Sequence, residues 1–174
     1  MEKWITLCDP TLLISADEYD EICPSISDKN YILLYFFGDI DIDMQNELHR
    51  VAEQRKLKII SFGRVRPWCD KCIDSDPTFF LAYFKNAQYI VTNTFHGTIF
   101  SVLYKKRFSA FVDTKIKVKD FLCSIGLDGH VAISATDIIG LYDNCEVLSE
   151  TVQGNLNKII GDSRKYLQDC LGDK

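Results

Sequence analysis

Short apolar runs alternate along this chain with segments in which apolar residues recur at helical spacing. The first run, YILLYFF at residues 31–37, is continuous rather than alternating, which is typical of a strand buried on both faces of a parallel sheet. Similar runs rich in branched and aromatic residues predict strands over 58–62, 88–92 and 108–112. Because helical patterns separate the strands, the expected fold class is α/β, a Rossmann-like open parallel sheet with helices on both faces.

The helical segments have recognisable faces and starts. Leu48, Val51 and Ala52 share one side of MQNELHRVAEQRK, and Pro77 occupies a favoured first helical position in PTFFLAYFKNA. Further helices are expected in HGTIFSVLYKK, in KDFLCSIGL and over about 149–171, where glycines leave open a break into two helices. The stretch GRVRPWCDKCIDSD predicts a loop. Four aromatic residues at helical spacing are expected in the core: Phe79, Phe80, Tyr83 and Phe84.

Composition limits the size and class of the molecule. With 174 residues, 47% of them hydrophobic, and a net charge of −5, the chain is long enough for one well-buried globular domain, and two full domains would be cramped. Its longest apolar run falls far short of the roughly 20 residues that a membrane-spanning helix needs. The first residues also lack the order of a signal peptide. We therefore expect a cytoplasmic protein without a transmembrane segment.

The seven cysteines are scattered and odd in number, which favours reduced thiols over a disulfide framework. CDKC at residues 69–72 has the spacing of metal ligands, but the sequence offers neither a second such pair nor a suitable histidine pair. Loop thiols are the expected state, and we predict no metal or cofactor.

The turn TNTFHG at residues 92–97 is the strongest candidate for a functional site. It joins a predicted strand to a predicted helix, and open parallel sheets bind ligands beyond the carboxyl ends of their strands. Free backbone N–H groups and the helix dipole there suit a phosphate or carboxylate. Asn93 and Thr94 are good capping residues, and Gly97 would let a ligand approach the backbone. His96 then either caps the helix or acts as an acid–base catalyst.

A basic segment follows this turn. Residues 105–119 hold six of the chain's 20 Lys and Arg but only one of its 25 Asp and Glu. In an otherwise acidic chain, this asymmetry indicates an anionic small ligand rather than nucleic acid. The alternative is a solvated, alternating sheet edge in which Lys115, Lys117 and Lys119 point to water.

At this point the sequence resembles a known family. QYIVTNTFHGTIFSVLYKKRFSAF is similar to the signature of the polysaccharide pyruvyl transferase family, in which an apolar strand runs into T-D-x-x-H-G and then a helix and a strand. CDPTLLIS, DPTFFLAYFKNA and DTKIKVKDFL resemble the family segments around that signature. Many members have an arginine two residues before the histidine, thought to hold the donor's anionic groups. Here that position is Thr94, and a branch of the family with serine or threonine there resembles this chain.

The resemblance implies a two-domain transferase of the GT-B type, with a cleft between two Rossmann-like halves. This chain corresponds to the carboxyl-terminal half, so residues 1–174 are expected to form a single donor-side domain, with the amino-terminal acceptor-side domain absent. The implied reaction transfers a pyruvyl ketal from phosphoenolpyruvate, an anionic donor, to a saccharide acceptor of a cell-surface polysaccharide and expels phosphate.

Against this chemistry, His96 is the candidate general acid or base. Thr94 and Thr98 would hydrogen-bond phosphate together with the helix terminus. Lys115 or Lys117 would pair with carboxylate, and Asn93 would position the substrate. Arg64 or Arg66 would supply the cation that Thr94 replaces. The substrate-binding candidates are therefore Asn93, Thr94, Gly97, Thr98, Lys115, Lys117 and Arg64.

The sequence is also compatible with two other functions. The donor domain of a nucleotide-sugar glycosyltransferase would need an acidic residue after a strand for the ribose hydroxyls, and Asp39 after YILLYFFG is a partial match. A non-catalytic α/β domain that binds an anion or a partner protein is the third possibility. Of the remaining histidines, His49 is expected to be solvated and His130 to lie in a turn.

Overall fold

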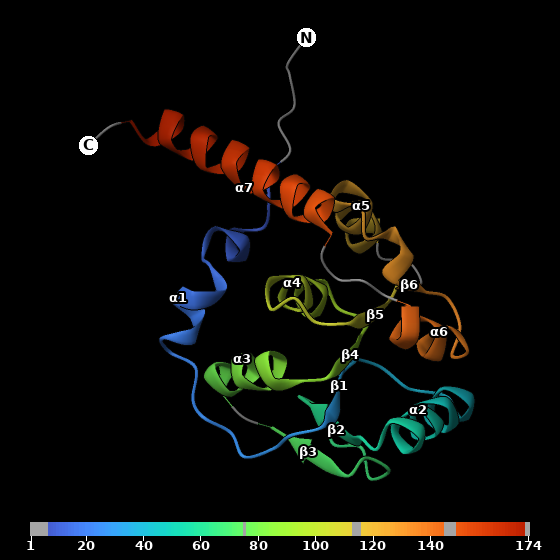
Figure 1. Ribbon diagram of the computed structural model, residues 1–174. Helices are drawn as coiled ribbons and strands as arrows, with labels where there is room; N and C mark the ends of the chain where they lie inside the picture. Colours follow the sequence, from blue (N-terminus) through green and yellow to red (C-terminus); the bar gives the residue numbers. More distant parts are fainter. Residues whose placement is uncertain (1–6, 75, 113–115, 145–148, 173–174) are drawn as a thin grey trace.

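The computed structural model describes residues 7–74, 76–112, 116–144 and 149–172 (Figure 1). In chain order, the first elements are the 3₁₀ turn η1 (Pro10–Leu13), α1 (Ala16–Asp20), β1 (Tyr31–Tyr35), α2 (Ile42–Arg55), β2 (Lys58–Phe62), β3 (Lys71–Ile73), α3 (Pro77–Asn86) and β4 (Tyr89–Thr92). They are followed by α4 (Phe95–Leu103), β5 (Phe108–Phe111), α5 (Ile116–Ile125), the 3₁₀ turn η2 (Asp128–His130), β6 (Val131–Ala132), α6 (Asp137–Asn144) and α7 (Glu150–Leu171).

The strands of the described residues form one parallel sheet in the order β3-β2-β1-β4-β5-β6. Leu33 of β1 lies between Ile60 of β2 and Ile90 of β4. The chain moves outward from β1 to β3, returns to pair β4 with the free side of β1, and then moves outward again. This reversal places the switch point, where open α/β sheets bind ligands, between β1 and β4. The predicted parallel sheet is confirmed.

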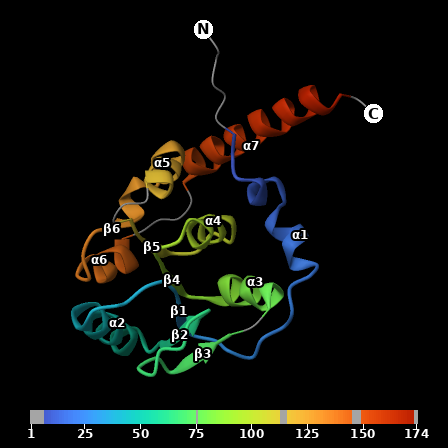
Figure 2. The ribbon, with the colours of Figure 1, turned by 180° about the vertical axis from the view of Figure 1, so that it is seen from behind.

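Helices cover both faces of the sheet, as predicted (Figures 1 and 2). One core contains buried residues of α3, α4, α5 and α7, and the other contains those of α2 and α6. β1 contributes to both, because Tyr31 and Leu33 face the first core while Ile32 and Leu34 face the second. This two-sided burial explains why the run YILLYFF is continuous rather than alternating. The aromatic residues of α3 pack in the first core, also as predicted.

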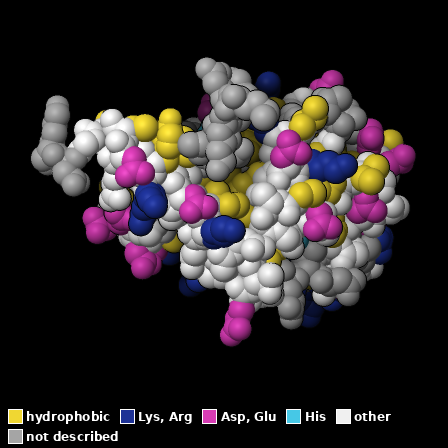
Figure 3. Space-filling view, turned by 90° about the horizontal axis from the view of Figure 1, so that it is seen from above, with side chains coloured by type: hydrophobic (Ala, Val, Ile, Leu, Met, Phe, Trp, Pro, Cys, Tyr) yellow, Lys and Arg dark blue, Asp and Glu magenta, His cyan; other side chains and the backbone are white. Residues whose placement is uncertain are grey.

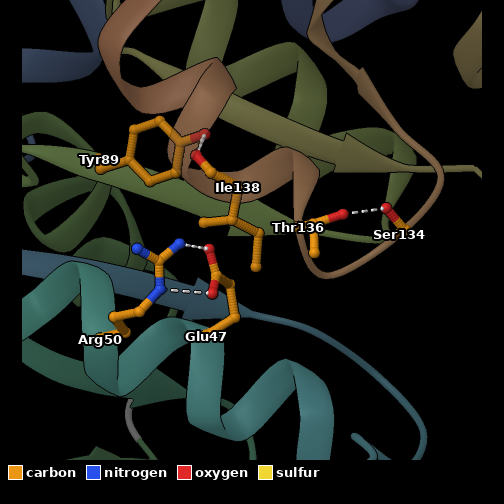
Figure 4. Close-up of polar contacts among 6 residues, drawn as sticks. All are labelled: Glu47, Arg50, Tyr89, Ser134, Thr136 and Ile138. Carbon is orange, nitrogen blue, oxygen red and sulfur yellow. Dashed lines mark hydrogen bonds and ion pairs between the residues drawn. The ribbon is translucent and has the colours of Figure 1, made fainter.

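Figure 4 shows how α6 is held against the sheet. The hydroxyl of Tyr89 in β4 donates a hydrogen bond to the carbonyl of Ile138 at 3.3 Å, and both residues are buried. Ser134 and Thr136 join their hydroxyls at 2.9 Å in the turn before the helix, and Glu47 pairs with Arg50 on the neighbouring α2. The buried Tyr89 bond joins α6 to the sheet, whereas the other two contacts lie within the turn and within α2.

Two short strands were not expected from the sequence. β3 lies within the predicted loop and pairs with β2, with Lys71 opposite Ile60. β6 has two residues and pairs with the end of β5. Neither segment is long enough to show a periodic apolar pattern, so only pairing with a neighbouring strand defines them.

The last helix is continuous, whereas the sequence left open a break into two helices at its glycines. α7 runs unbroken through Gly154 and Gly161, and its full length is visible in Figure 2. Val152 and Leu156 are buried on its inner side, and the Ser163 hydroxyl accepts a hydrogen bond from the Cys8 amide at 2.9 Å. These contacts offset the cost of about 1 kcal/mol for each glycine in a helix interior.

The surface seen from above, over α7, carries interspersed acidic, basic and apolar side chains (Figure 3). A mixed surface of this kind does not provide the single-sign field that favours nucleic acid. Among the described residues, no helix is long and apolar enough to cross a membrane.

Candidate functional site

A groove of about 620 Å³ lies at the carboxyl ends of β1, β4, β5 and β6, next to the switch point of the sheet. Three aromatic side chains and three polar ones contribute to its lining: Phe36, Phe37, Phe111, Asp39, Asn93 and Lys119. Its position is the one that the sequence predicts for a ligand in an open parallel sheet. Its size falls within the usual range for small-molecule sites.

His96 is the second residue of α4, and the local sequence explains its placement. The Thr94 hydroxyl caps the helix by accepting a hydrogen bond from the Gly97 amide at 2.8 Å, and the Thr92 hydroxyl accepts one from the Thr94 amide at 3.1 Å. Capping by Thr94 leaves His96 free of that task, and 58% of its side chain is exposed. The imidazole is therefore available to a ligand at the helix amino terminus.

Asp9 lies beside this histidine, although 86 residues separate them in the chain. Its Oδ1 accepts hydrogen bonds from the amide and hydroxyl of Thr11 at 3.0 and 2.6 Å, which caps η1. Its Oδ2 lies 3.8 Å from Nε2 of His96, a distance suited to an ion pair when the imidazole is protonated. The sequence pattern Asp-Pro-Thr indicates a capping residue, but nothing in it places Asp9 near His96.

Asn93 joins the two loops at the centre of the site. Its Oδ1 accepts a hydrogen bond from the Phe37 amide at 2.9 Å, and its Nδ2 donates one to the Phe37 carbonyl at 2.6 Å. The turn after β4 is thereby held to the loop after β1. The predicted role for Asn93 was substrate positioning, and the contact observed is with the groove wall.

Gly97 and Thr98 face the protein interior. A Cβ on Gly97 would lie 2.2 Å from the Thr92 hydroxyl oxygen, so the glycine is needed for close packing of α4 on β4 rather than for the approach of a ligand. Thr98 is fully buried, and its hydroxyl donates to the Thr94 carbonyl at 3.0 Å. Thr98 thus bonds to its own helix, and contact with phosphate would require its hydroxyl to turn away from that carbonyl.

The two arginines beyond β2 differ in their surroundings. Arg64 is exposed, with its guanidinium 5.6 Å from the ring centre of Phe37 at the groove. Arg66 is only 9% exposed and donates from Nη2 to the carbonyls of Phe36 and Gly38 at 2.9 and 2.8 Å. Burial lowers the pKa of Arg66 from its ordinary value. Arg66 therefore supports the loop after β1, while Arg64 remains available to a ligand.

The last four residues of the basic segment, 116–119, begin α5 instead of forming an alternating sheet edge. Val118 is buried, whereas Lys117 and Lys119 are exposed. Of these two lysines, Lys119 lines the groove, and Lys115 lies outside the described residues. Lys119 was not among the predicted site residues, because the helix was expected to begin only at Lys119. Its start at Ile116 gives the helical phase that separates Lys119 from Lys117.

The other two histidines each lie against an aromatic side chain. His130 lies in the turn η2, as predicted, but it is buried, stacks on Phe108 and places Nδ1 3.0 Å from the Phe108 carbonyl. His49 is half-buried, with its ring centre 5.7 Å from that of Trp68. Neither is among the residues that line the groove, and His96 reaches the site through the turn that follows Asn93 rather than through the groove lining itself.

The parallel sheet with helices on both faces and the groove at its switch point define a Rossmann-like α/β domain. A sequence model of the polysaccharide pyruvyl transferase family matches residues 4–113, more than half of the chain, and the matched stretch includes Asp9 and His96. The chain belongs to the polysaccharide pyruvyl transferase family, as the resemblance in its sequence predicted. No curated protein sequence matches it.

Two solved structures of similar fold are named as UDP-N-acetylglucosamine 2-epimerases, one of them as putative. A putative UDP-N-acetylglucosamine 2-epimerase from Listeria monocytogenes shares 12% identity over 88% of this chain and 52% of its own, with a TM-score of 0.55. The UDP-GlcNAc 2-epimerase from Neisseria meningitidis, bound to UDP-GlcNAc, shares 12% identity over 86% of this chain and 48% of its own, with a TM-score of 0.53. These likenesses show the fold, and the chain spans about half the length of both structures.

Proposed function

We propose that this chain is the donor-binding half of a polysaccharide pyruvyl transferase that uses phosphoenolpyruvate. The observation that carries the proposal is the exposed imidazole of His96 at the start of α4, with the carboxylate of Asp9 at 3.8 Å. Family membership supports the reaction class. The groove beside the turn adds a place for the donor, and Arg64 and Lys119 add positive charge at that place.

The reaction defines what the site must do. One sugar hydroxyl adds to C2 of phosphoenolpyruvate while the methylene carbon takes up a proton and becomes a methyl group. A second hydroxyl then forms the other C–O bond of the ketal, and the bond from C2 to the phosphate oxygen breaks with its electron pair leaving on phosphate. Of the two protons released by the sugar hydroxyls, one matches the proton gained by the methylene carbon, and the other leaves with phosphate or passes to solvent. A proton donor and acceptor, together with cations for the carboxylate and phosphate, are therefore required.

The described residues divide these roles. His96 moves the proton, and Asp9 stabilises the imidazolium that forms when it has accepted one. The backbone N–H groups at the start of α4 and its dipole favour the departing phosphate. Lys119 and Arg64 face the anionic groups of the donor. Asn93 keeps the groove in shape through its two hydrogen bonds to Phe37.

Substitution of His96 tests the catalytic role. In the complete two-domain protein, His96→Gln should lower kcat by roughly 10²-fold or more, the usual scale of a general acid or base, without a change in melting temperature. His49→Gln is the matched control, because His49 lies on α2 away from the groove. Full turnover by a folded His96→Gln protein would exclude His96 as the acid–base group.

A second candidate is the donor domain of a nucleotide-sugar enzyme. Asp39 lines the groove, and one structure of similar fold holds UDP-GlcNAc. Melting temperatures of the chain measured with phosphoenolpyruvate and with UDP-GlcNAc separate the two candidates. The pyruvyl transferase proposal expects a shift with phosphoenolpyruvate that Lys119→Gln removes and Lys158→Gln, an exposed substitution on α7, retains. A shift with UDP-GlcNAc alone would favour the second candidate.

A further inference from the structure

A second hollow, of about 390 Å³, lies at the opposite edge of the sheet from the groove. It is formed where α3 leads into β4 and where α4 leads into β5, with Tyr142 of α6 beside it. Four of its eight lining residues are basic: Lys85, Lys105, Lys106 and Arg107. None of the lining residues that the structure describes is acidic, although the chain as a whole carries a net charge of −5. We call this feature the basic hollow.

Two acidic side chains close in sequence or contact to the lining residues already have partners. Asp20 pairs with Lys85 at 2.7 Å, and Asp143 pairs with Arg55. Within the described part of the chain, neither Lys105 nor Lys106 forms an ion pair. Asp20 offsets the charge of Lys85, and the other three basic lining residues give the hollow an excess of positive charge. Like charges around a concave site concentrate the field inside it.

The positive charge of Lys106 is disfavoured by its position in the hollow. Its side chain is half-buried, and burial lowers its pKa, with the neighbouring ammonium of Lys85 acting in the same direction. Burial removes water from the ammonium group of Lys106, and the positive charge of Lys85 repels it. Both effects disfavour the charged form of Lys106. An anion bound in the hollow would favour the charged form of Lys106 and so offset both effects.

Local structure does not account for these lysines. Helix carbonyls often attract lysine, but the end of α4 is capped by its own backbone: the Lys105 amide donates to Val102 at 3.0 Å, and the Lys106 amide donates to Ser101 at 2.8 Å. Lys105 also has a φ of 55°, the left-handed conformation that glycine adopts more readily. Capping of the helix end therefore does not require either lysine, and at Lys105 the backbone conformation favours glycine.

We propose that the basic hollow binds a phosphate-type oxyanion, either free or as a phosphate ester. Lysine ammonium groups bind phosphate as point charges without a fixed fork geometry, which suits an open site lined by flexible side chains. The site lies at the amino ends of β4 and β5, whereas His96 follows the carboxyl end of β4. It is therefore separate from the proposed donor site and does not depend on the function proposed for His96.

Calorimetric titration of the chain at constant ionic strength tests this site, with pyrophosphate and glucose 1-phosphate as probes and chloride as the background anion. We expect at least one probe to bind, and the double variant Lys105→Gln/Lys106→Gln to raise its Kd by roughly tenfold or more. The control Lys56→Gln/Lys158→Gln removes the same charge at exposed sites on α2 and α7, and its Lys56 has the same left-handed φ at the end of α2. It should leave the Kd unchanged. Tighter binding of the ester would identify an organic phosphate as the ligand, and tighter binding of pyrophosphate a free oxyanion.

Three results would overturn the proposal: no binding of either probe, equal weakening in both double variants, or weakening by Lys119→Gln in its place. A lowered melting temperature of the Lys105→Gln/Lys106→Gln protein without any oxyanion binding would assign the lysines to stability alone. A measurement on the unmodified chain covers the case in which that variant does not fold. Pyrophosphate should then protect Lys105 and Lys106, but not Lys56, from an amine-acetylating reagent, as read by mass spectrometry, and equal acetylation with and without pyrophosphate would contradict the site.

Discussion

At the scale of single residues, the turn between β4 and α4 depends on the absence of a side chain. Gly97 lies against Thr92 and Thr94 so closely that a Cβ would meet their hydroxyl oxygens at 2.2 and 2.6 Å. Both hydroxyls also make the hydrogen bonds that begin the helix. The position of His96 on the following turn is therefore fixed by packing as well as by capping.

This packing predicts a stability effect. Gly97→Ala should lower the free energy of unfolding by roughly 1–3 kcal/mol, because α4 must move away from β4 to admit the methyl group. Denaturant unfolding of the chain measures the change. Gly161→Ala is the matched control, since that helical glycine has no atom within 4 Å of its missing Cβ. Equal stability of the two variants would show that the turn tolerates the methyl group.

At the scale of elements, α7 keeps two glycines in its interior without any steric need for them. An added Cβ at Gly154 or Gly161 would meet nothing within 4 Å. Each change to alanine should therefore raise the free energy of unfolding by about 0.5–1 kcal/mol, because alanine loses less conformational entropy in a helix. Thermal or denaturant unfolding would detect the sum of both changes. A decrease in stability would mean that the helix bends at these positions in solution.

A second element-level feature joins the segment before β1 to β3 and α3. The carboxylate of Asp28 accepts hydrogen bonds from the Lys71 ammonium and the Tyr83 hydroxyl, each at 2.6 Å. Burial by itself would raise the pKa of Asp28, but these two hydrogen bonds and the positive charge of Lys71 outweigh it and lower the pKa from its ordinary value of 3.8. The folded state thus favours the ionised carboxylate.

The sign of the pKa shift gives a pH dependence. The stabilisation by Asp28 is fully present above the unfolded-state pKa of about 3.9 and is lost as the pH falls through the lower folded-state value. Asp28→Asn should therefore be less stable than the unmodified chain at pH 7, and the difference should shrink below about pH 4. Unfolding free energies measured between pH 7 and pH 3 test this. A difference that is constant with pH would indicate a loss of packing rather than of charge.

At the scale of the whole molecule, apolar side chains are exposed around the carboxyl edge of the sheet. Phe37, Val65 and Ile133 follow β1, β2 and β6, and Ile116 begins α5; all four are exposed. In the proposed two-domain enzyme this edge forms one wall of the cleft, and the acceptor is held by the other domain. Positioning of two reactants in this way can supply roughly 7–11 kcal/mol of a reaction barrier.

The isolated chain should consequently bind phosphoenolpyruvate weakly and transfer no pyruvyl group. Calorimetry measures the binding, and release of phosphate in the presence of a saccharide acceptor measures the transfer. Addition of the acceptor-side domain should restore turnover. Transfer by the 174-residue chain alone, at a rate typical of a complete enzyme, would contradict the half-enzyme proposal.

Much of the fold follows from patterns that are local in the sequence. The continuous run of β1 predicts a strand buried on both faces, and the alternation of strands with helices predicts a parallel sheet. The candidate turn was also predictable, because a threonine cap followed by a helix marks the carboxyl end of β4. The short strands β3 and β6 were not, since two or three residues carry no period and depend on pairing with β2 and β5.

The sequence by itself determined the fold class, the family and the placement of His96 at the start of a helix, because periodicity, capping and motif spacing act over a few residues. The tertiary structure decided which distant groups meet. It placed Asp9 beside His96, brought Lys119 rather than Lys117 to the groove, turned Thr98 inward and gathered Lys85 with Lys105 and Lys106 at the other edge. Each of these depends on helix phase or on packing between separate elements, and such contacts leave no local pattern in the chain.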